Sequence, residues 1–338
     1  MKKIGLLLAL LGALAACAVP ADEATAALAP GRDARLTLYT SHKQAVYGPI
    51  VKEFQEETGI WVEVITGGTN ELLERIAAEA EQPVCDVMFG GGVESLCAYE
   101  SCFEPYACAG ADRLREGLRP EGDAWTPFSS LPLVFIYNPK LVEPDQLTGW
   151  ADLIDPRWKG KIAFADPTVS GSSYTAALTL LSCLPGDDWE LLGQFAANLD
   201  GGILADSGDV VGAVANGSRY LGVTLEETAL KGLGQGAEIA VFLPAEGTSA
   251  VPDGSALVAG APHAENAKAF LEFVQSRDVQ ELVVSQFSRR SVRTDVHDPD
   301  SLPPVEELDV IDYDVHWAAG LKEEFTARWL ALCGEERA

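Results

Sequence analysis

Basic residues are scarce in this sequence: 24 Lys and Arg stand against 51 Asp and Glu, giving a formal net charge of −27. Nucleic acids are bound through basic clusters, and none is present, so nucleic acid is excluded as a partner. Only four histidines occur, and neither a GxSxG nor an HExxH pattern appears. We therefore expect no enzyme activity, no cofactor and no metal site of the zinc-helix type.

Long apolar runs are also scarce, and the single candidate, Ile4 to Leu14, is shorter than the about 20 residues that span a bilayer. It follows Lys2 and Lys3 and ends in Leu-Ala-Ala-Cys at Cys17, which resembles a bacterial lipobox. We expect residues 1–16 to be a cleaved signal peptide, Cys17 to be lipidated and 17–34 to be a flexible tether. The predicted location is periplasmic or lipid-anchored at the outer face of the cytoplasmic membrane. An ordinary signal peptide is the alternative.

Six further cysteines remain after Cys17, an even number that in an exported protein is compatible with disulfides or buried thiols. Cys97, Cys102 and Cys108 are close enough in sequence to bridge locally, and the pairing stays open. Their spacings lack the CxxC of a zinc site, so no metal is expected there.

The hydrophobic pattern predicts an α/β fold. Strands are expected at 36–40, 61–65 and 84–89, with helices at 49–58 and 71–81 between them, which favours a parallel sheet. A second α/β run has strands at 161–165, 202–204 and 220–225 and helices at 174–183 and 210–216. A strand at 256–259 and a helix at 263–275 follow. Two α/β lobes with crossovers near 131–137 and 248–252 are predicted.

Small and hydroxylated residues follow several of these strands. In open α/β sheets, ligands bind beyond the carboxyl ends of strands, where helix N-termini present free N–H groups. Such loops suit a small anion without needing lysine, although a Ser or Thr before a helix is often only an N-cap. The candidates are Ser41, His42, Thr69, Gly91, Gly92, Ser170, Gly171, Ser172, Ser173, Tyr174, Ser207 and Asp209.

Several segments resemble type II periplasmic solute-binding proteins of ABC importers, in the branch of ferric-ion-binding proteins and their organophosphate-binding relatives. They include LTLYTSHKQA (36–45), CDVMFGGG (85–92), DLIDPRWKGKIAFADPTVSGSSY (152–174), VANG (214–217) and RRSVRTD (289–295). The resemblance implies two lobes joined by crossover hinge strands, around a ligand cleft. Residues 35–134 plus 251–290 would form the N-lobe, and 135–250 plus 291–338 the C-lobe. It also implies a monomer that delivers a small solute to a membrane permease.

The resemblance also bears on the ligand. Ferric-binding members use an adjacent Tyr pair, a His and often a Glu after the third strand. Here His42 matches, but Leu225-Glu226-Glu227 replaces the Tyr pair and Gly91 or Gly92 the Glu. The chain is closer to the branch that binds hexose phosphates, phosphoglycerate or aminoethylphosphonate. By this resemblance the hydroxyl loops hold phosphoryl oxygens, and the end of the strand that contains Thr224 belongs to the ligand site. Asp209 and Glu226 accept from hydroxyls or an amine, and Arg290 adds charge. Ferric iron and a sensory ectodomain acting with a membrane kinase are the alternatives.

Overall fold

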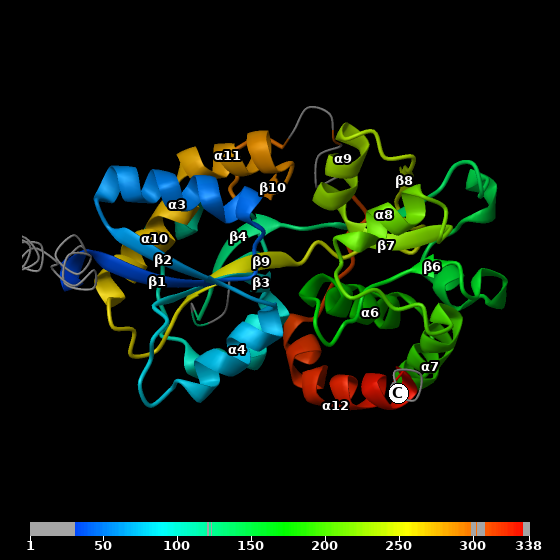
Figure 1. The fold of residues 1–338 in the computed structure, drawn as a ribbon, viewed down its shortest axis with the longest axis horizontal. Helices are drawn as coiled ribbons and strands as arrows, with labels where there is room; N and C mark the ends of the chain where they lie inside the picture. Colours follow the sequence, from blue (N-terminus) through cyan, green and yellow to red (C-terminus); the bar gives the residue numbers. More distant parts are fainter. Residues whose placement is uncertain (1–30, 120–121, 123, 299–301, 303–307, 334–338) are drawn as a thin grey trace, which may run out of the picture.

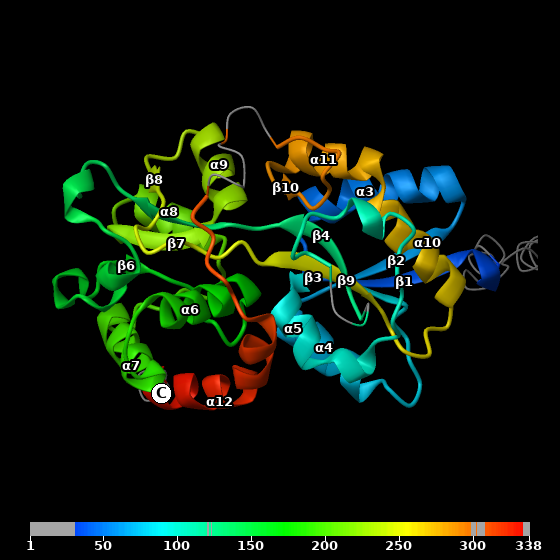
Figure 2. The same ribbon diagram turned by 180° about the vertical axis from the view of Figure 1, so that it is seen from behind.

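The computed structural model describes residues 31–119, 122, 124–298, 302 and 308–333, arranged as two α/β lobes side by side (Figures 1 and 2). The predicted signal peptide, Cys17 and most of the predicted tether lie outside these residues. Among the described residues, no helix combines the length and hydropathy needed to cross a membrane.

The first lobe is built on a six-stranded sheet of order β10-β4-β9-β3-β1-β2. β2 and β3 pair in parallel with β1, whereas β4, β9 and β10 pair in antiparallel fashion with their neighbours. Successive side chains of β1 point to opposite faces of the sheet, so Leu38 packs with Phe54 and Phe270 while Tyr39 packs with Leu73 and Met88. The elements are β1 (Arg35–Thr40), α3 (Gln44–Thr58), β2 (Trp61–Thr66), α4 (Thr69–Ala78), β3 (Val87–Gly92), α5 (Val93–Ala98), β4 (Thr126–Ser130), β9 (Pro252–Leu257), α10 (Ala264–Gln275), α11 (Arg277–Phe287) and β10 (Arg290–Ser291).

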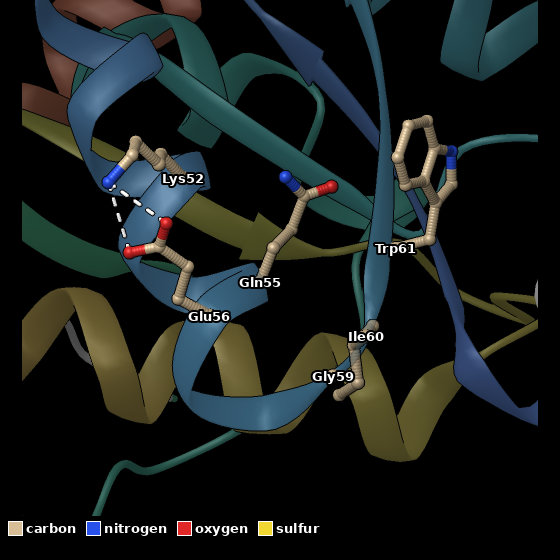
Figure 3. A pocket seen from close by; sticks show the side chains of 6 residues that line it. All are labelled: Lys52, Gln55, Glu56, Gly59, Ile60 and Trp61. Atoms are coloured by element: carbon tan, nitrogen blue, oxygen red, sulfur yellow. Dashed lines mark hydrogen bonds and ion pairs between the residues drawn. The ribbon is translucent and has the colours of Figure 1, made fainter.

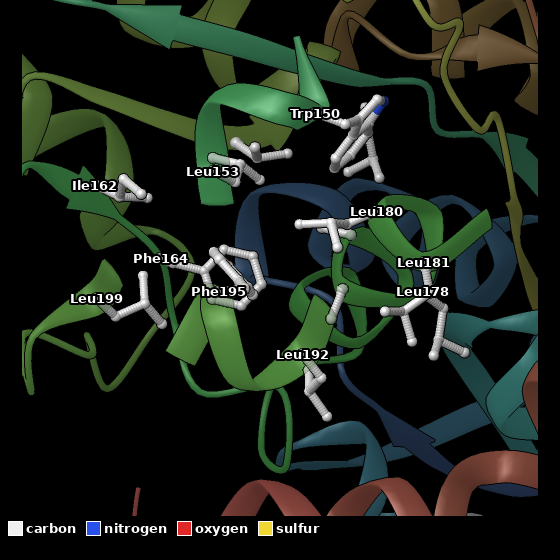
Figure 4. Close-up of a cluster of buried hydrophobic side chains, with 14 of the residues drawn as sticks. Trp150, Leu153, Ile162, Phe164, Leu178, Leu180, Leu181, Leu192, Phe195 and Leu199 are labelled. Atoms are coloured by element: carbon white, nitrogen blue, oxygen red, sulfur yellow. The ribbon is translucent and has the colours of Figure 1, made fainter. Parts of the chain in front are cut away.

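The second lobe is built on a four-stranded sheet of order β6-β7-β5-β8. Its main core gathers Trp150, Phe164, Phe195 and leucines of α6 and α7 on one face of that sheet (Figure 4). Its elements are β5 (Leu133–Tyr137), β6 (Ile162–Ala163), α6 (Gly171–Cys183), α7 (Asp188–Leu199), α8 (Asp209–Ala215), β7 (Leu221–Leu225), α9 (Glu226–Gly234) and β8 (Ala240–Phe242). Short 3₁₀ turns are η1 (Arg32–Ala34), η2 (Glu100–Cys102) and η3 (Ala111–Arg113) in the first lobe, and η5 (Pro144–Gln146), η6 (Trp150–Ile154) and η7 (Pro156–Trp158) in the second.

The chain passes between the lobes after β4, where residues 131–132 lead to β5, and again between β8 and β9. A third connection leads from β10 to the C-terminal helix α12 (Val315–Cys333), which contacts both α5 and α7 (Figure 2). Phe325 and Trp329 of α12 belong to the core of the second lobe. The helix therefore touches both lobes on the side opposite α9 and α11.

The expected α/β architecture is confirmed, with corrections to its details. Gly90, Gly91 and Gly92 belong to β3 instead of following it, because β3 pairs with β9 as far as Gly92. The expected strand at 202–204 is only an isolated bridge between Leu204 and Ala165. α6 starts at Gly171, three residues earlier than predicted, because Ser170 caps it. The predicted N-lobe limit at 290 falls within β10, whose Ser291 also pairs in the first sheet.

The local disulfide that the cysteine spacing allowed is absent, since Cys97 and Cys102 carry free thiols. Burial raises the pKa of Cys97 to about 11 and that of Cys85 above its usual range. Cys85 and Cys97 are therefore protonated at neutral pH.

Candidate ligand-binding site between the two lobes

The carboxyl end of β3 brings several predicted residues together. Gly90 and Gly91 have φ values of +103° and +97°, which only glycine adopts readily. A Cβ atom on Gly90 would lie 2.9 Å from His42 Nε2 and 3.0 Å from Ser41 Oγ, and one on Gly91 would lie 2.6 Å from Thr69 Cγ2. The glycines therefore let the ends of β1 and β3 and the start of α4 meet.

The second lobe brings the start of α6 to the same place. A Cβ atom on Gly171 would lie 3.5 Å from Thr69 Oγ1 and 4.0 Å from the amide nitrogen of Gly92. The starts of α4, α5 and α6 therefore converge across the lobe boundary. We call this group of residues the interlobe site: Ser41, His42, Thr69, Gly90–Gly92, Glu94 and 170–175.

The helix starts at the interlobe site present amides. The N-cap residues of α4 and α5 are Gly68 and Gly92, which have no side chain to cap the first-turn N–H groups. At α6, Ser170 Oγ accepts from the amide of Ser173 and lies 3.1 Å from Ser172 Oγ. Open amides, hydroxyl donors and the positive ends of helix dipoles are the groups that bind a small oxyanion.

Hydrogen bonds join the two lobes around the interlobe site. Asn70 Nδ2 donates to the carbonyl of Thr168 at 2.7 Å. Thr175 Oγ1, from α6, donates to Glu94 Oε1, from α5. At the exposed rim, Lys43 Nζ lies 2.8 Å from Asp206 Oδ2. The lobes are therefore closed in this structure.

A charged cluster of Glu226, Glu227, Asp253, Arg289 and Arg290 lies beside the crossover between β4 and β5. Arg290 is 1% exposed and donates from Nε and Nη2 to the two carboxylate oxygens of Glu226, at 2.7 and 3.0 Å. Arg289 donates to Asp253 at 2.7 Å and to Glu227 at 3.4 Å. Both arginines belong to the first lobe and both glutamates to the second, so the Arg290–Glu226 and Arg289–Glu227 pairs cross the lobe boundary.

The cluster sets the protonation of its neighbours. Burial raises the pKa of Glu227, but Arg289 and Lys231 outweigh it and hold that pKa below its ordinary value. His42 is buried against Phe89 and Phe128, and burial, together with Arg289 and Lys231, holds its pKa well below the usual range. Its Nε2 atom has no hydrogen-bond partner. His42 is therefore a neutral imidazole facing the charged cluster.

Glu94 is the site residue that sequence reasoning missed. It is fully buried, and its Oε2 atom has no hydrogen-bond partner. Burial raises the pKa of Glu94, with Thr175 and Lys322 acting in the opposite direction. The motif comparison considered only Gly91 and Gly92 at the position of the family's glutamate, and Glu94 follows them in the chain. The signal was an acidic residue two positions after the last of the glycines that end β3.

Three other predicted residues, Tyr174, Thr224 and Asp209, have surroundings of their own. The Tyr174 hydroxyl donates to the carbonyl of Ala318 at 2.5 Å, and its ring packs against Phe325, so this side chain supports α12. Thr224 is buried within β7. Asp209 is exposed at the start of α8, after the turn that contains Ser207.

A surface hollow of about 260 Å³ lies elsewhere, at the end of α3 and the beginning of β2 (Figure 3). It is lined by Lys52, Gln55, Glu56, Gly59, Ile60 and Trp61. Because Trp61 opens β2, this hollow lies at the amino end of the strand, away from the interlobe site. Within the described part of the chain, no group of three or more His, Cys, Asp or Glu residues is arranged to hold a metal ion.

Comparison with known proteins decides the family. The family model described as "Bacterial extracellular solute-binding protein" matches residues 84–316. The chain belongs to this family. The resemblance inferred from the sequence motifs is therefore confirmed.

Similar proteins differ in the ligands that their names state. Iron uptake protein A1 of Synechocystis is 29% identical over 278 residues, which is 76% of each chain. A Salmonella typhimurium periplasmic protein named for 2-aminoethylphosphonate binding is 27% identical and covers 72% of this solute-binding protein and 73% of its own length. AfuA of Actinobacillus pleuropneumoniae, solved with fructose-6-phosphate, superimposes with a TM-score of 0.80 at 23% identity, covering 89% of this chain and 98% of that one. The last comparison confirms the two-lobed fold.

Proposed function

We propose that this solute-binding protein captures a small phosphorylated or phosphonate solute between its lobes and delivers it to an ABC permease. The observation that supports this ligand class is the convergence of the starts of α4, α5 and α6 around Thr69, Gly92 and Gly171. Phosphoryl oxygens would accept hydrogen bonds from the open amides and from the hydroxyls of Ser170 and Ser172. In the proposal the mature protein is exported and held at the membrane by lipidated Cys17.

The charged cluster argues against ferric iron as the ligand. The two carboxylates at the position of the family's tyrosine pair, Glu226 and Glu227, already face Arg290 and Arg289. A ferric ion would have to displace these guanidinium groups or share a site with them, and like charges disfavour this. The phenolate ligands that a hard ferric ion favours are absent at these two positions.

A thermal-shift screen followed by calorimetry tests the proposal. A ligand at 100 times its Kd stabilises the folded state by about 2.7 kcal/mol, which raises the melting temperature measurably. We expect this response with at least one of glucose 6-phosphate, 3-phosphoglycerate and 2-aminoethylphosphonate. Stabilisation by Fe(III) alone would overturn the proposal.

Ser172→Ala locates the site. Removing one hydroxyl donor to an anion costs about 0.5–1.5 kcal/mol, or about 2- to 12-fold in Kd. Ser182→Ala is the matched control, because Ser182 Oγ donates to the carbonyl of Leu178 near the other end of α6. Equal affinities for the phosphorylated ligand in both variants would exclude the start of α6 as the anion site.

A further inference from the structure

Glu94 is a buried carboxylate whose charge nothing in the interlobe site balances by direct contact. One oxygen accepts the hydroxyl of Thr175, and the other has no hydrogen-bond partner. The nearby cation, Lys322, directs its ammonium to Ser95 Oγ at 2.7 Å. A buried carboxylate without a partner cation is costly, so its open oxygen is suited to a donor that arrives with the ligand.

The carboxylate lies next to the proposed anion position. A Cβ atom on Gly92 would lie 2.5 Å from Glu94 Oε2, so this oxygen lies against the backbone of Gly92, the N-cap residue of α5. A Cβ atom on Gly171 would lie 4.0 Å from the amide nitrogen of Gly92 and 3.5 Å from Thr69 Oγ1, so Gly171 is close to both residues. A positive and a negative group of one short molecule would therefore reach Glu94 and the helix starts at the same time.

The other carboxylates at the lobe boundary already have cationic partners. Glu226 is paired with Arg290, Glu227 with Arg289 and Lys231, and Asp253 with Arg289. A ligand ammonium group would have to compete with these cations for any of the three carboxylates. Glu94 offers an open oxygen without such competition.

We propose that Glu94 binds an ammonium group of the ligand, so that the captured solute is a zwitterion carrying a phosphonate or phosphate a few bonds from an amine. This inference rests on the proposed function and narrows it to one substrate class. The ligand's negative group lies at the starts of α4 and α6, and its ammonium donates to Glu94 Oε2. A neutral polyol phosphate would leave the charge of Glu94 uncompensated.

Calorimetry on the full mature chain tests the assignment with three matched probes. They are 2-aminoethylphosphonate, 2-hydroxyethylphosphonate and ethylphosphonate, which differ only in the group at carbon 2. A hydrogen bond between charged groups corresponds to about 10- to 100-fold in Kd, and we expect the wild type to prefer the amine over both other probes by at least about tenfold. This comparison needs no variant.

Glu94→Gln then assigns the preference to this residue. We expect the variant to lose the preference for the amine, so that it binds 2-aminoethylphosphonate and ethylphosphonate with similar affinity. Glu246→Gln is the matched control, because Glu246 also has an unpartnered Oε2 but lies in the second lobe beside Ala151. That variant should keep the wild-type preference.

Three results separate the inference from the proposed function. If Glu94→Gln keeps the preference for the amine, Glu94 is not its partner and the inference fails. If the wild type binds sugar phosphates but does not prefer the amine, the inference fails while the proposed function stands. If no phosphorylated or phosphonate compound binds, both fail.

Discussion

The ion pair between Glu226 and Arg290 connects α9 of the second lobe with β10 of the first, and Glu226→Gln tests what this pair does. The charges are buried and joined by two hydrogen bonds of 2.7 and 3.0 Å. At an effective dielectric constant of about 20, unit charges about 4 Å apart attract by ~4 kcal/mol. Removing one partner of a buried pair typically costs about 3–5 kcal/mol. Because Arg290 Nη1 also lies 3.5 Å from Asp298 Oδ2, Glu226→Gln leaves this arginine a second carboxylate, and we expect a cost at the lower end of that range.

This cost falls on the closed form, because in separated lobes the Arg290 guanidinium can reach water. A loss of 3 kcal/mol lowers the closed population relative to the open one about 150-fold. If the ligand binds only between closed lobes, its apparent Kd rises as the closed fraction falls. We expect Glu226→Gln to increase the radius of gyration in small-angle X-ray scattering and to weaken ligand binding at least about tenfold.

A double variant separates closure from direct ligand contact. Glu226→Leu with Arg290→Met replaces the pair by apolar side chains, a change that is often neutral for stability. Asp298, which also faces Arg290, keeps the guanidinium of Arg115 at 3.4 Å. If the pair acts only in closure, the double variant regains the compact form and much of the affinity. If it regains compactness but not affinity, Glu226 also contacts the ligand. Unchanged scattering and unchanged Kd in Glu226→Gln would refute the reasoning.

Three further predictions concern single positions. Gly91→Ala should lower the free energy of unfolding by about 1–3 kcal/mol, because its positive φ and the contact with Thr69 strain any side chain; an unchanged urea midpoint would contradict this. Burial lowers the pKa of Lys322 to about 8, so the unfolded chain binds this proton more tightly than the folded chain does. The free energy of unfolding of the wild type should therefore rise between about pH 8 and 10.5, by up to ~3 kcal/mol relative to Lys322→Met. Parallel pH profiles of the two proteins in denaturant titrations would exclude this effect of Lys322. Lys43→Ala should change ligand affinity by less than about fivefold, since Lys43 and Asp206 are exposed and such pairs contribute about 0–1 kcal/mol; a larger, salt-independent loss would show a role beyond the rim contact.

The fold could be predicted largely because its signals are local. Alternating apolar residues mark β1 and β2, and the intervening helix ends at Gly59, whose φ of +71° requires a residue tolerant of that conformation. One error came from a pairing partner distant in sequence. The glycines after Phe89 read as a loop, but β9, more than 160 residues later, supplies the strand that pairs with them.

The interlobe site could be predicted only in part, for the same reason. The local sequence identifies Ser170 and Thr69 as residues at the start of a helix. The pairing of Glu226 with Arg290, in contrast, depends on how the lobes close. Tyr174 belongs to the motif that identifies the family, yet its direction is set by α12, nearly 150 residues later. Glu94 could not be predicted as a site residue, because a single acidic residue in a helix is usually exposed to solvent.

An excess of acidic residues and an anionic ligand are compatible in this molecule because the charges near the lobe boundary are largely compensated. Arg289 and Arg290 face Asp253, Glu227 and Glu226, so these arginines are already engaged and the anion must rely on amides, hydroxyls and helix dipoles. Such a site attracts a free dianion weakly against a net charge of −27. A zwitterion experiences less electrostatic repulsion, since the acidic protein attracts its ammonium group. That group can then contact Glu94 once the lobes close. The overall charge and the open oxygen of Glu94 therefore favour the same class of ligand.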